Sequence, residues 1–373
     1  MKAWPVVGIL IVQALLCLAH WFLYSTLIDF WWPLSPAAGG ELRLIAMVLS
    51  VSFIVAALLG FRFTNWLIAL TYQIAAVWLG LLNYFFIAAC LAWLTDIALR
   101  LLLPGAAHLH ARPYILAVLF AAAVLTVVYG ILNARSIRVR RVSVKLPNLP
   151  ESWRGRTALV FSDLHLGNIN GLRFARRIAA MAQRLSPDII FIPGDLFDGT
   201  KADPDTQAAP LYALAPPLGI YFVAGNHEEF GGEAHYAEAL SHSGFRVLDN
   251  KRVTIDGLQV VGVPYHSSTS PMQLRTFLEG LHLKDGKASI LLQHVPNRLP
   301  IVEQSGVNLQ LSGHTHGGQL FFFTVITRQA FGKFTYGLQR FGELQVYTSS
   351  GAGTWGPPMR VGTIPEIVLL TFE

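Results

Sequence analysis

The first third of the chain consists mainly of long apolar runs separated by short polar segments. A helix needs about 20 mostly apolar residues to cross the hydrocarbon core of a bilayer, and each run is that long. The pattern therefore predicts four transmembrane helices, near residues 6–28, 42–61, 66–103 and 114–132. We expect the first run to be a retained anchor, because no small-residue cleavage site follows it.

After residue 133 the pattern changes to short apolar strands that alternate with helical stretches. The strand candidates are Thr157–Ser162, Ile189–Pro193, Ile220–Ala224, Val253–Ile255, Gln259–Val263, Ile290–Gln293, Leu309–Ser312, Leu344–Thr348 and Ile367–Phe372. The helix candidates are Leu172–Leu185, Glu233–Ser243, Met272–Leu281 and Arg298–Gln304. Asp256 and Gly257, which lie between two of the strands, predict a tight hairpin turn.

Early βαβ units followed by later hairpins predict an α/β fold, a sandwich of two mixed sheets flanked by helices. An all-α transmembrane region of about four helices precedes it. We therefore expect a transmembrane anchor at residues 1–133, a basic juxtamembrane linker at 134–152 and a globular domain at 153–373.

The composition supports this division. Only 13% of the residues are charged, and the mean hydropathy is +0.47. Residues 1–133 hold 8 charged residues, whereas the 240 residues that follow hold 42. These values exclude a disordered chain and argue against a wholly soluble enzyme. Both cysteines, Cys17 and Cys90, lie in apolar runs, so no disulfide framework is predicted.

The formal net charge is +6, and the basic excess forms a run from Arg135 to Lys145 just after the last apolar segment. This position fits a membrane surface better than nucleic acid, so no nucleic-acid partner is expected. If the chain crosses the membrane four times, the basic run lies on the same side as Lys2 and Arg62. The other side then has only three basic residues. The positive-inside rule then predicts a cytoplasmic C-terminal domain.

His20 and Asp96 are ionisable residues within the apolar runs. An intramembrane ionisable group can mark a proton relay or a transport path. Each lies near a predicted helix end and neither has an obvious partner in the sequence. We therefore expect interfacial positions for both, and no transporter.

Polar clusters follow the ends of several predicted strands, where sandwich and doubly wound folds place their sites. They are Asp163-Leu164-His165, Gly194-Asp195-Leu196-Phe197-Asp198, Gly225-Asn226-His227-Glu228, Gln293-His294 and Gly313-His314-Thr315-His316. Each cluster alone is a weak signal, because such motifs are commonly turns. All five in series would bring seven candidate metal ligands to one sheet edge. They are four histidines, two aspartates and one asparagine.

Histidine, carboxylate and amide ligands suit divalent ions such as Mn, Fe, Zn or Co, and no thiolate is present to make a soft site. Seven ligands are too many for one ion. They suit two ions about 3.5–4 Å apart that share one carboxylate. Such a pair lowers the pKa of a water molecule, orients it for in-line attack and neutralises phosphate oxygens.

In this order, the five clusters resemble those of the calcineurin-like metallophosphoesterase superfamily. The four-span anchor, together with Gly313–Gln319, is similar to the membrane-anchored bacterial branch and to transmembrane proteins with a metallophosphoesterase domain. The resemblance covers residues 150–373, and the anchor more weakly. It implies a four-layer αββα sandwich and hydrolysis of a phosphate bond at two divalent metal ions.

The resemblance also implies a role for each polar residue. The first ion would be held by Asp163, His165 and His316, and the second by Asn226, His294 and His314. Asp195 would bridge the two ions.

Two residues would act beside the ions. His227 would contact the substrate phosphate and protonate the leaving group. The carboxylate of Asp198 would orient this histidine.

Two departures from the family pattern narrow the substrate. Gly199 follows Asp198 where the Ser/Thr protein phosphatases have an arginine, which disfavours protein phosphatase activity. His227 stands where the soluble hydrolase of UDP-diacylglucosamine typically has an arginine, although the membrane branch includes proteins assigned to that reaction. A nuclease is disfavoured because no extended basic patch lies near the motifs.

Three further features have alternative interpretations. Glu228 and Glu229 are expected to be solvated residues that open a loop. The segment Phe321–Phe323 is either a buried strand or an apolar lip for acyl chains. Trp355 is either part of that lip or a core tryptophan.

The sequence thus favours a membrane-anchored phosphohydrolase of a bacterial inner membrane that acts at the bilayer on a phosphorylated or nucleotide-linked lipid. A candidate substrate is UDP-2,3-diacylglucosamine, cleaved to UMP and a lipid phosphate. The alternatives are a phosphodiesterase for soluble nucleotides and a non-catalytic membrane sensor of a phospholigand. His227 disfavours the sensor, because binding alone needs no leaving-group acid.

Overall fold

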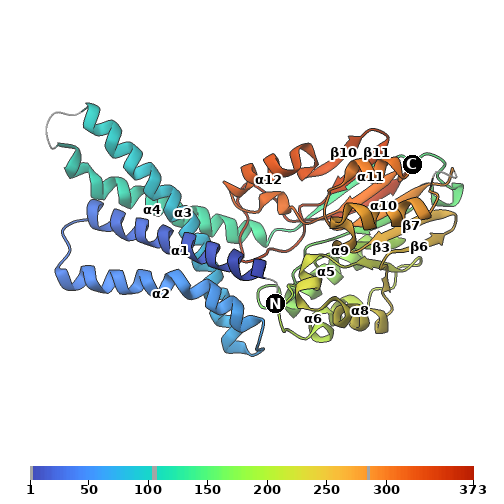
Figure 1. Cartoon of the computed structure of the whole chain (residues 1–373), viewed down its shortest axis with the longest axis horizontal. Helices are drawn as coiled ribbons and strands as arrows, with labels where there is room; N and C mark the ends of the chain where they lie inside the picture. The colour runs from blue at the N-terminus through green and yellow to red at the C-terminus, as the bar shows by residue number, and fades with distance from the viewer. Residues whose placement is uncertain (1–2, 103–106, 284–285) are drawn as a thin grey trace. The chain divides into compact units, whose positions relative to one another are not determined.

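A computed structural model describes residues 3–102, 107–283 and 286–373 (Figure 1). The chain forms two compact units. The helical unit comprises the residues up to Leu132 together with Gly356–Met359, and the sandwich unit comprises Asn133–Trp355 and Arg360–Glu373.

Four long helices make up the helical unit: α1 (Ala3–Phe30), α2 (Pro36–Gly60), α3 (Trp66–Leu102) and α4 (Ala107–Ala134). All four are long and apolar enough to cross a membrane, which confirms the prediction of four long apolar helices. The start of α2 shows a local reason for a boundary. Ser35 accepts a hydrogen bond from the Ala38 N–H, and a proline occupies the first turn, where it costs no intrahelical hydrogen bond.

Asp96 and His20 have partners within the helical unit, contrary to expectation. Asp96 is fully buried and accepts hydrogen bonds from Arg100 of its own helix and from Arg112 of α4, at 2.8–2.9 Å. His20 accepts a hydrogen bond from the indole N–H of Trp78 at 2.9 Å. A buried charge is costly unless it is paired, so the ion pairs of Asp96 tie α3 to α4.

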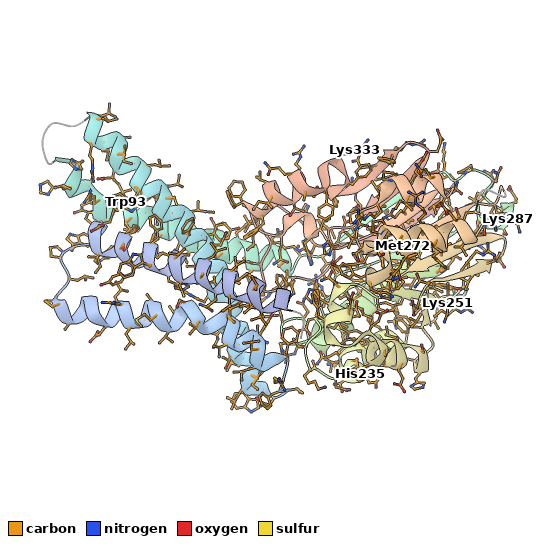
Figure 2. All side chains as sticks on the ribbon, in the orientation of Figure 1. Trp93, His235, Lys251, Met272, Lys287 and Lys333 are labelled. Atoms are coloured by element: carbon orange, nitrogen blue, oxygen red, sulfur yellow. The ribbon has the colours of Figure 1, made fainter. Side chains whose placement is uncertain are left out.

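Aromatic side chains surround Arg112, the partner of Asp96 on α4. Arg112 lies over the rings of Phe30 and Trp93, with 5.0 and 5.8 Å between its guanidinium carbon and the ring centroids. Trp93, labelled in Figure 2, also donates a hydrogen bond to Thr26 of α1. These contacts connect α1, α3 and α4.

Two six-stranded sheets form the sandwich unit. The first sheet has the order β1 (Arg138–Val144), β12 (Glu366–Phe372), β2 (Thr157–Val160), β3 (Ile189–Pro193), β4 (Ile220–Val223) and β5 (Arg246–Val247). The second has the order β10 (Gly337–Phe341), β11 (Leu344–Thr348), β9 (Leu309–Ser312), β8 (Ser289–Gln293), β7 (Leu258–Val263) and β6 (Lys251–Ile255). Both sheets are mixed, as predicted.

The helices of the sandwich unit lie between the strands in sequence (Figure 1). They are α5 (Leu172–Leu185), α6 (Pro204–Tyr212), α7 (Asn226–Gly231), α8 (Glu233–His242), α9 (Tyr265–Thr269), α10 (Pro271–Gly280), α11 (Leu299–Gln304) and α12 (Phe323–Phe331). Short 3₁₀ turns η1 (Glu151–Trp153), η2 (His316–Gly318) and η3 (Gly332–Thr335) complete the elements.

Three hydrophobic cores separate four layers, because alternate side chains of a strand point to opposite faces. Ile190 packs with α5, α6 and α8, whereas its neighbour Phe191 packs between the two sheets. In the second sheet, Val260 faces the inter-sheet core and Val261 packs against α10 and α11. This is the αββα sandwich that the sequence predicts.

The basic segment 134–152 was expected to be a linker, and this expectation is wrong. Arg138–Val144 within it forms the edge strand β1. It pairs in parallel with β12 over its whole length. Val144 is buried in the inter-sheet core, whereas the arginines are exposed. The strand is hard to predict because its charged residues do not show the apolar alternation of an inner strand. Charges on an edge strand also discourage pairing with other chains.

Most other predicted strands and helices match the elements of the structure closely, and a few elements were missed. Asp256 and Gly257 form the hairpin turn between β6 and β7, both with positive φ. The helices α6, α7, α9 and α12 and the strands β5 and β10 were not predicted. The alternative of a buried strand at Phe321–Phe323 is wrong, because all three side chains are about half exposed and Phe323 begins α12.

We predict that Val144→Asp destabilises the sandwich unit, because it places an unpaired charge in the inter-sheet core. Arg141→Asp, on the same strand but exposed, is the matched control. A loss of about 3 kcal/mol in a domain of this size lowers the unfolding temperature by about 10 °C. Thermal unfolding of the purified full chain measures both variants. Equal, small shifts would contradict the role of β1 in the core.

Candidate metal centre

The clustered polar residues lie in loops at the carboxyl ends of β2, β3, β4, β8 and β9. Because β2, β3 and β4 run parallel, as do β8 and β9, their loops meet at one edge of the sandwich. Five of the clustered residues have left-handed backbone conformations: Asp163, His165, Asp195, His314 and His316. Such conformations are unfavourable for residues with side chains, so the surrounding structure holds these loops in place.

Asp163, His165 and His316 form the first group. Each offers a ligand atom, and these atoms lie within 4.8 Å of one another. The Nε2 atoms of His165 and His316 are 3.0 Å apart, and His316 Nε2 is 3.4 Å from a carboxylate oxygen of Asp163. The structure thus brings together the three residues that the resemblance assigns to the first ion.

Asp195, His294 and His314 form the second group, again with ligand atoms within 4.8 Å of one another. His314 Nδ1 lies 3.0 Å from the side-chain oxygen of Asn226. The structure thus also brings together the residues that the resemblance assigns to the second ion.

Asp195 lies between the two groups. Its Oδ2 atom is 3.0 Å from His294 Nε2 and 3.9 Å from His165 Nε2. Its other oxygen accepts a hydrogen bond from the His227 N–H at 3.0 Å. Gly225 is needed beside it, because a Cβ there would come within 2.1 Å of that oxygen.

The chemical state of these side chains fits divalent cations. Burial holds the pKa of His165 and His316 well below the usual range and lowers that of His314 to about 4. The neutral imidazole is the form that binds a metal ion. The buried His165 Nδ1 has no hydrogen-bond partner in the described part of the chain, and His165 Nε2 lies 3.0 Å from another ring nitrogen, that of His316.

His294 differs from the other histidines. Burial disfavours its charge, but the nearby carboxylate of Asp195 outweighs burial and raises the pKa of His294 to about 10. Its Nδ1 lies 2.8 Å from the carbonyl oxygen of Pro193, which leaves Nε2 facing Asp195. A divalent ion would compete with the proton at this position.

His227 lies beside the first group, with its ring centroid 4.6 Å from that of His165. The expectation that the Asp198 carboxylate orients it is wrong. His227 Nδ1 lies 2.9 Å from the backbone carbonyl oxygen of Asp198, which acts as the acceptor. The carboxylate instead accepts hydrogen bonds from the N–H groups of Asn168 and Thr200. Asp198 therefore orients His227 through its backbone and shapes the loop with its side chain.

Glu228 is a second correction, because it is fully buried rather than solvated. Its carboxylate accepts hydrogen bonds from the backbone N–H groups of Asp195, Phe197 and Gly225 at 2.7–3.0 Å. It thereby joins the loop after β3 to the start of α7. Its place three residues after Gly225, as in a capping box, was a signal in the sequence. Its neighbour Glu229 is exposed, as expected.

Arg360 is a site residue that sequence reasoning missed. It is fully buried and donates hydrogen bonds to the backbone carbonyls of Ser350, Gly351, Gly353 and His316. Burial lowers its pKa to about 10, so it remains a cation at neutral pH. It also lies 3.2 Å from His316 Nδ1, and so it fixes the loop and the ring of a candidate ligand together. No motif marks it in the sequence.

Exposed aromatic side chains flank His227. The rings of Phe230 and Trp355 lie 5.7 and 5.6 Å from the His227 ring, centroid to centroid. More than half of each side chain is accessible to solvent. The interpretation of Trp355 as a core residue is therefore wrong.

The fold and these two joined groups define a metallophosphoesterase, and comparison with known proteins agrees. The calcineurin-like phosphoesterase family matches residues 156–318. A transmembrane protein with metallophosphoesterase domain from Danio rerio is 30% identical over 333 residues, which cover 83% of this chain and 74% of that protein. The chain therefore belongs to the calcineurin-like metallophosphoesterase family.

Other relatives match about two thirds of the chain. An uncharacterized metallophosphoesterase from Aquifex aeolicus is 32% identical over 256 residues, covering 67% of this chain and 97% of that protein. One from Campylobacter jejuni is 31% identical over 260 residues and covers 66% of each chain. A solved structure of a dimetal phosphatase from Danio rerio matches 53% of this chain and 88% of that chain, with 13% identity and a TM-score of 0.39.

We predict that Glu228→Ala lowers both metal content and stability, because three buried N–H groups lose their acceptor. Each unpaired group costs about 1–3 kcal/mol. Glu229→Ala, at the adjacent exposed position, should leave both unchanged. Metal analysis and thermal unfolding of the two variants provide the measurement, and equal behaviour would contradict a supporting role for Glu228.

Proposed function

We propose that the protein hydrolyses a phosphate ester or pyrophosphate bond of a lipid-linked substrate at a centre of two divalent ions. The observation that carries this proposal is the position of Asp195 Oδ2, which faces a histidine of each ligand group. A single carboxylate oxygen placed in this way suits a bridge between two ions. Bound there, the ions would lower the pKa of water and neutralise phosphate oxygens.

His227 supports a hydrolytic role beyond binding. The hydrogen-bond partner of its Nδ1 is the Asp198 carbonyl, which can only accept, so the ring carries a proton at Nδ1. Nε2 is then the atom free to act on a substrate. In its protonated form it can give a proton to the leaving-group oxygen, which is the work of a general acid.

The aromatic side chains beside His227 support an apolar leaving group. Phe230 and Trp355 are exposed on the side where that group would depart. The four apolar helices support a substrate held in a membrane, because anchoring raises its effective concentration. UDP-2,3-diacylglucosamine, cleaved to UMP and a lipid phosphate, has this chemistry.

The location proposed for this reaction is the cytoplasmic face of a bacterial inner membrane. The support is the excess of Lys and Arg near one set of helix ends. A panel of phospholipids, nucleotide-linked lipids and soluble nucleotides, offered to the metal-loaded full chain in detergent, tests the substrate class by product mass. Cleavage of the soluble nucleotides alone would overturn the lipid assignment, and no cleavage of any kind would favour a sensor.

We predict that Asp195→Ala abolishes hydrolysis and reduces the metal content, because the shared carboxylate is lost. Asp205→Ala, an exposed carboxylate on α6, is the control and should behave as wild type. Metal analysis together with hydrolysis of an aryl phosphodiester in the presence of Mn measures both effects. A wild-type metal stoichiometry in Asp195→Ala would rule out the bridging role.

His227→Ala should keep its metal ions and lose activity in a way that depends on the leaving group. Loss of a general acid typically costs about 10²–10⁴-fold in rate. The loss should be smaller for a nitrophenyl ester than for an alkyl ester, because a good leaving group needs no proton. His235→Ala, an exposed histidine on α8 labelled in Figure 2, is the control. Equal losses for both esters would count against an acid role.

A further inference from the structure

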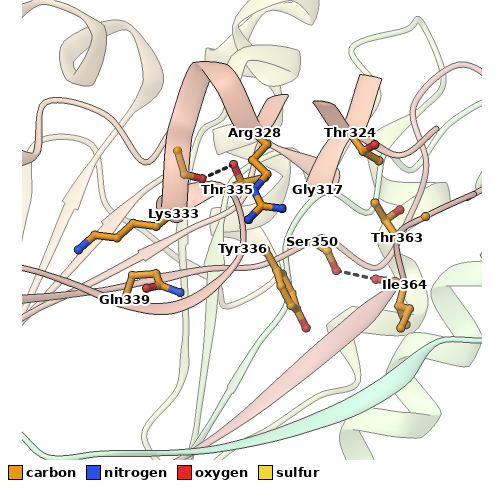
Figure 3. Close-up of a pocket in the computed structure, with 12 residues that line it drawn as sticks. Gly317, Thr324, Arg328, Lys333, Thr335, Tyr336, Gln339, Ser350, Thr363 and Ile364 are labelled. Atoms are coloured by element: carbon orange, nitrogen blue, oxygen red, sulfur yellow. Dashed lines mark hydrogen bonds between the residues drawn. The ribbon is translucent and has the colours of Figure 1, made fainter. Parts of the chain in front are cut away.

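A cavity of about 480 Å³ lies beside the loop that follows His316 (Figure 3). One wall comes from α12 and η3, and the other from the segment around Ser350 and Thr363. None of the residues assigned to the metal centre lines it, so it is a separate compartment. Its lining includes two cations, Arg328 and Lys333, and no acidic side chain.

Arg328 carries most of the argument for an anion. Its guanidinium points into the cavity in Figure 3, and it has no hydrogen-bond or ion-pair partner in the described part of the chain. Thr324 and Thr363 add hydroxyl groups to the lining of the cavity. A planar guanidinium with hydroxyl groups nearby suits the oxygens of a phosphate group.

Glu366, the acidic side chain hydrogen-bonded to Tyr336 of the cavity lining, has partners other than Arg328. Glu366 accepts hydrogen bonds from the hydroxyls of Tyr336 and Tyr347, at 2.8 and 3.1 Å, and from the Ser350 N–H. It is buried behind Tyr336 and does not line the cavity. The charge of Arg328 therefore stays available for a ligand.

The helix that carries Arg328 also presents an unusual apolar surface. Five nearby side chains are each about half exposed: Phe321, Phe322, Phe323, Val325 and Ile326. In the described part of α12 no residue is buried. Exposed apolar side chains next to cations are typical of segments that lie in a membrane interface, and this chain has four apolar helices long enough to cross a membrane.

We propose that α12 and the adjacent cavity bind an anionic phospholipid. The headgroup phosphate would lie against Arg328 at the mouth of the cavity. The acyl chains would lie against Val325, which neighbours Arg328 at a spacing of three residues, and against Ile326 beyond it. A free phosphate would leave that surface in water, whereas acyl chains remove it from water at a gain of about 25 cal/mol per Å². This goes beyond the proposed function, because it needs neither metal ions nor hydrolysis.

The test uses the full chain in detergent with a chelator present, so that no metal ion can hold the probe. The probes are dioctanoyl phosphatidate, dioctanoyl phosphatidylcholine, glycerol 3-phosphate and inorganic phosphate, with binding measured by titration. We expect phosphatidate to bind at least tenfold more tightly than each of the other three. Equal affinity for inorganic phosphate would show a site for free anions and overturn the lipid assignment.

Two double variants separate the headgroup from the acyl chains. Arg328→Gln with Lys333→Gln should weaken phosphatidate binding at least tenfold, whereas Arg173→Gln with Arg176→Gln, exposed on α5, should not. Val325→Ser with Ile326→Ser should remove the advantage of phosphatidate over glycerol 3-phosphate. Met272→Ser, at an exposed apolar residue of α10, is its control.

Wild-type affinity for phosphatidate in the Arg328 and Lys333 variant would overturn the proposal. Thermal unfolding of each variant shows that it is folded, and if the double variant is not, the single variant Arg328→Met replaces it. Hydrolysis of a soluble aryl phosphodiester with Mn, measured on the same proteins, keeps the two proposals apart. An inactive wild type that still binds phosphatidate would contradict the proposed reaction alone.

Discussion

The candidate metal centre depends on the satisfaction of buried backbone polar groups by two buried side chains, Glu228 and Arg360. Loops that turn sharply at strand ends cannot pair all their N–H and carbonyl groups with one another, and unpaired groups are costly away from water. Glu228 accepts hydrogen bonds from three N–H groups, and Arg360 donates to four carbonyl groups. Each side chain therefore fixes several segments at once, and the candidate ligands are positioned as a consequence.

The two sheets bring these loops together. Parallel strands present their carboxyl ends at the same edge, and the inter-sheet core holds the two edges against each other. The ligand groups therefore combine residues from both halves of the sandwich: Asp163 comes from the first sheet and His316 from the second. The family's chemistry needs this pairing, because neither sheet alone supplies a complete set of donors.

The surface of the sandwich unit has two places where apolar side chains remain exposed. One is beside His227, with Phe230 and Trp355, and the other is on α12, from Phe321 to Ile326. Exposed clusters of this kind mark interaction sites more often than accidents of packing. Both exposed surfaces fit the proposals of a lipid-linked substrate and of lipid binding, as do the four apolar helices.

The sequence by itself determined the four apolar helices, most inner strands and the set of candidate ligands, because each leaves a local signal. A long apolar run, an alternating strand or a polar motif after a strand can be read within a few residues. Only the tertiary structure decided the roles of β1, Asp96 and Arg360. Their burial and their partners depend on segments far away in the chain, such as β12 for β1 and the loop after β9 for Arg360, and no local pattern records such contacts.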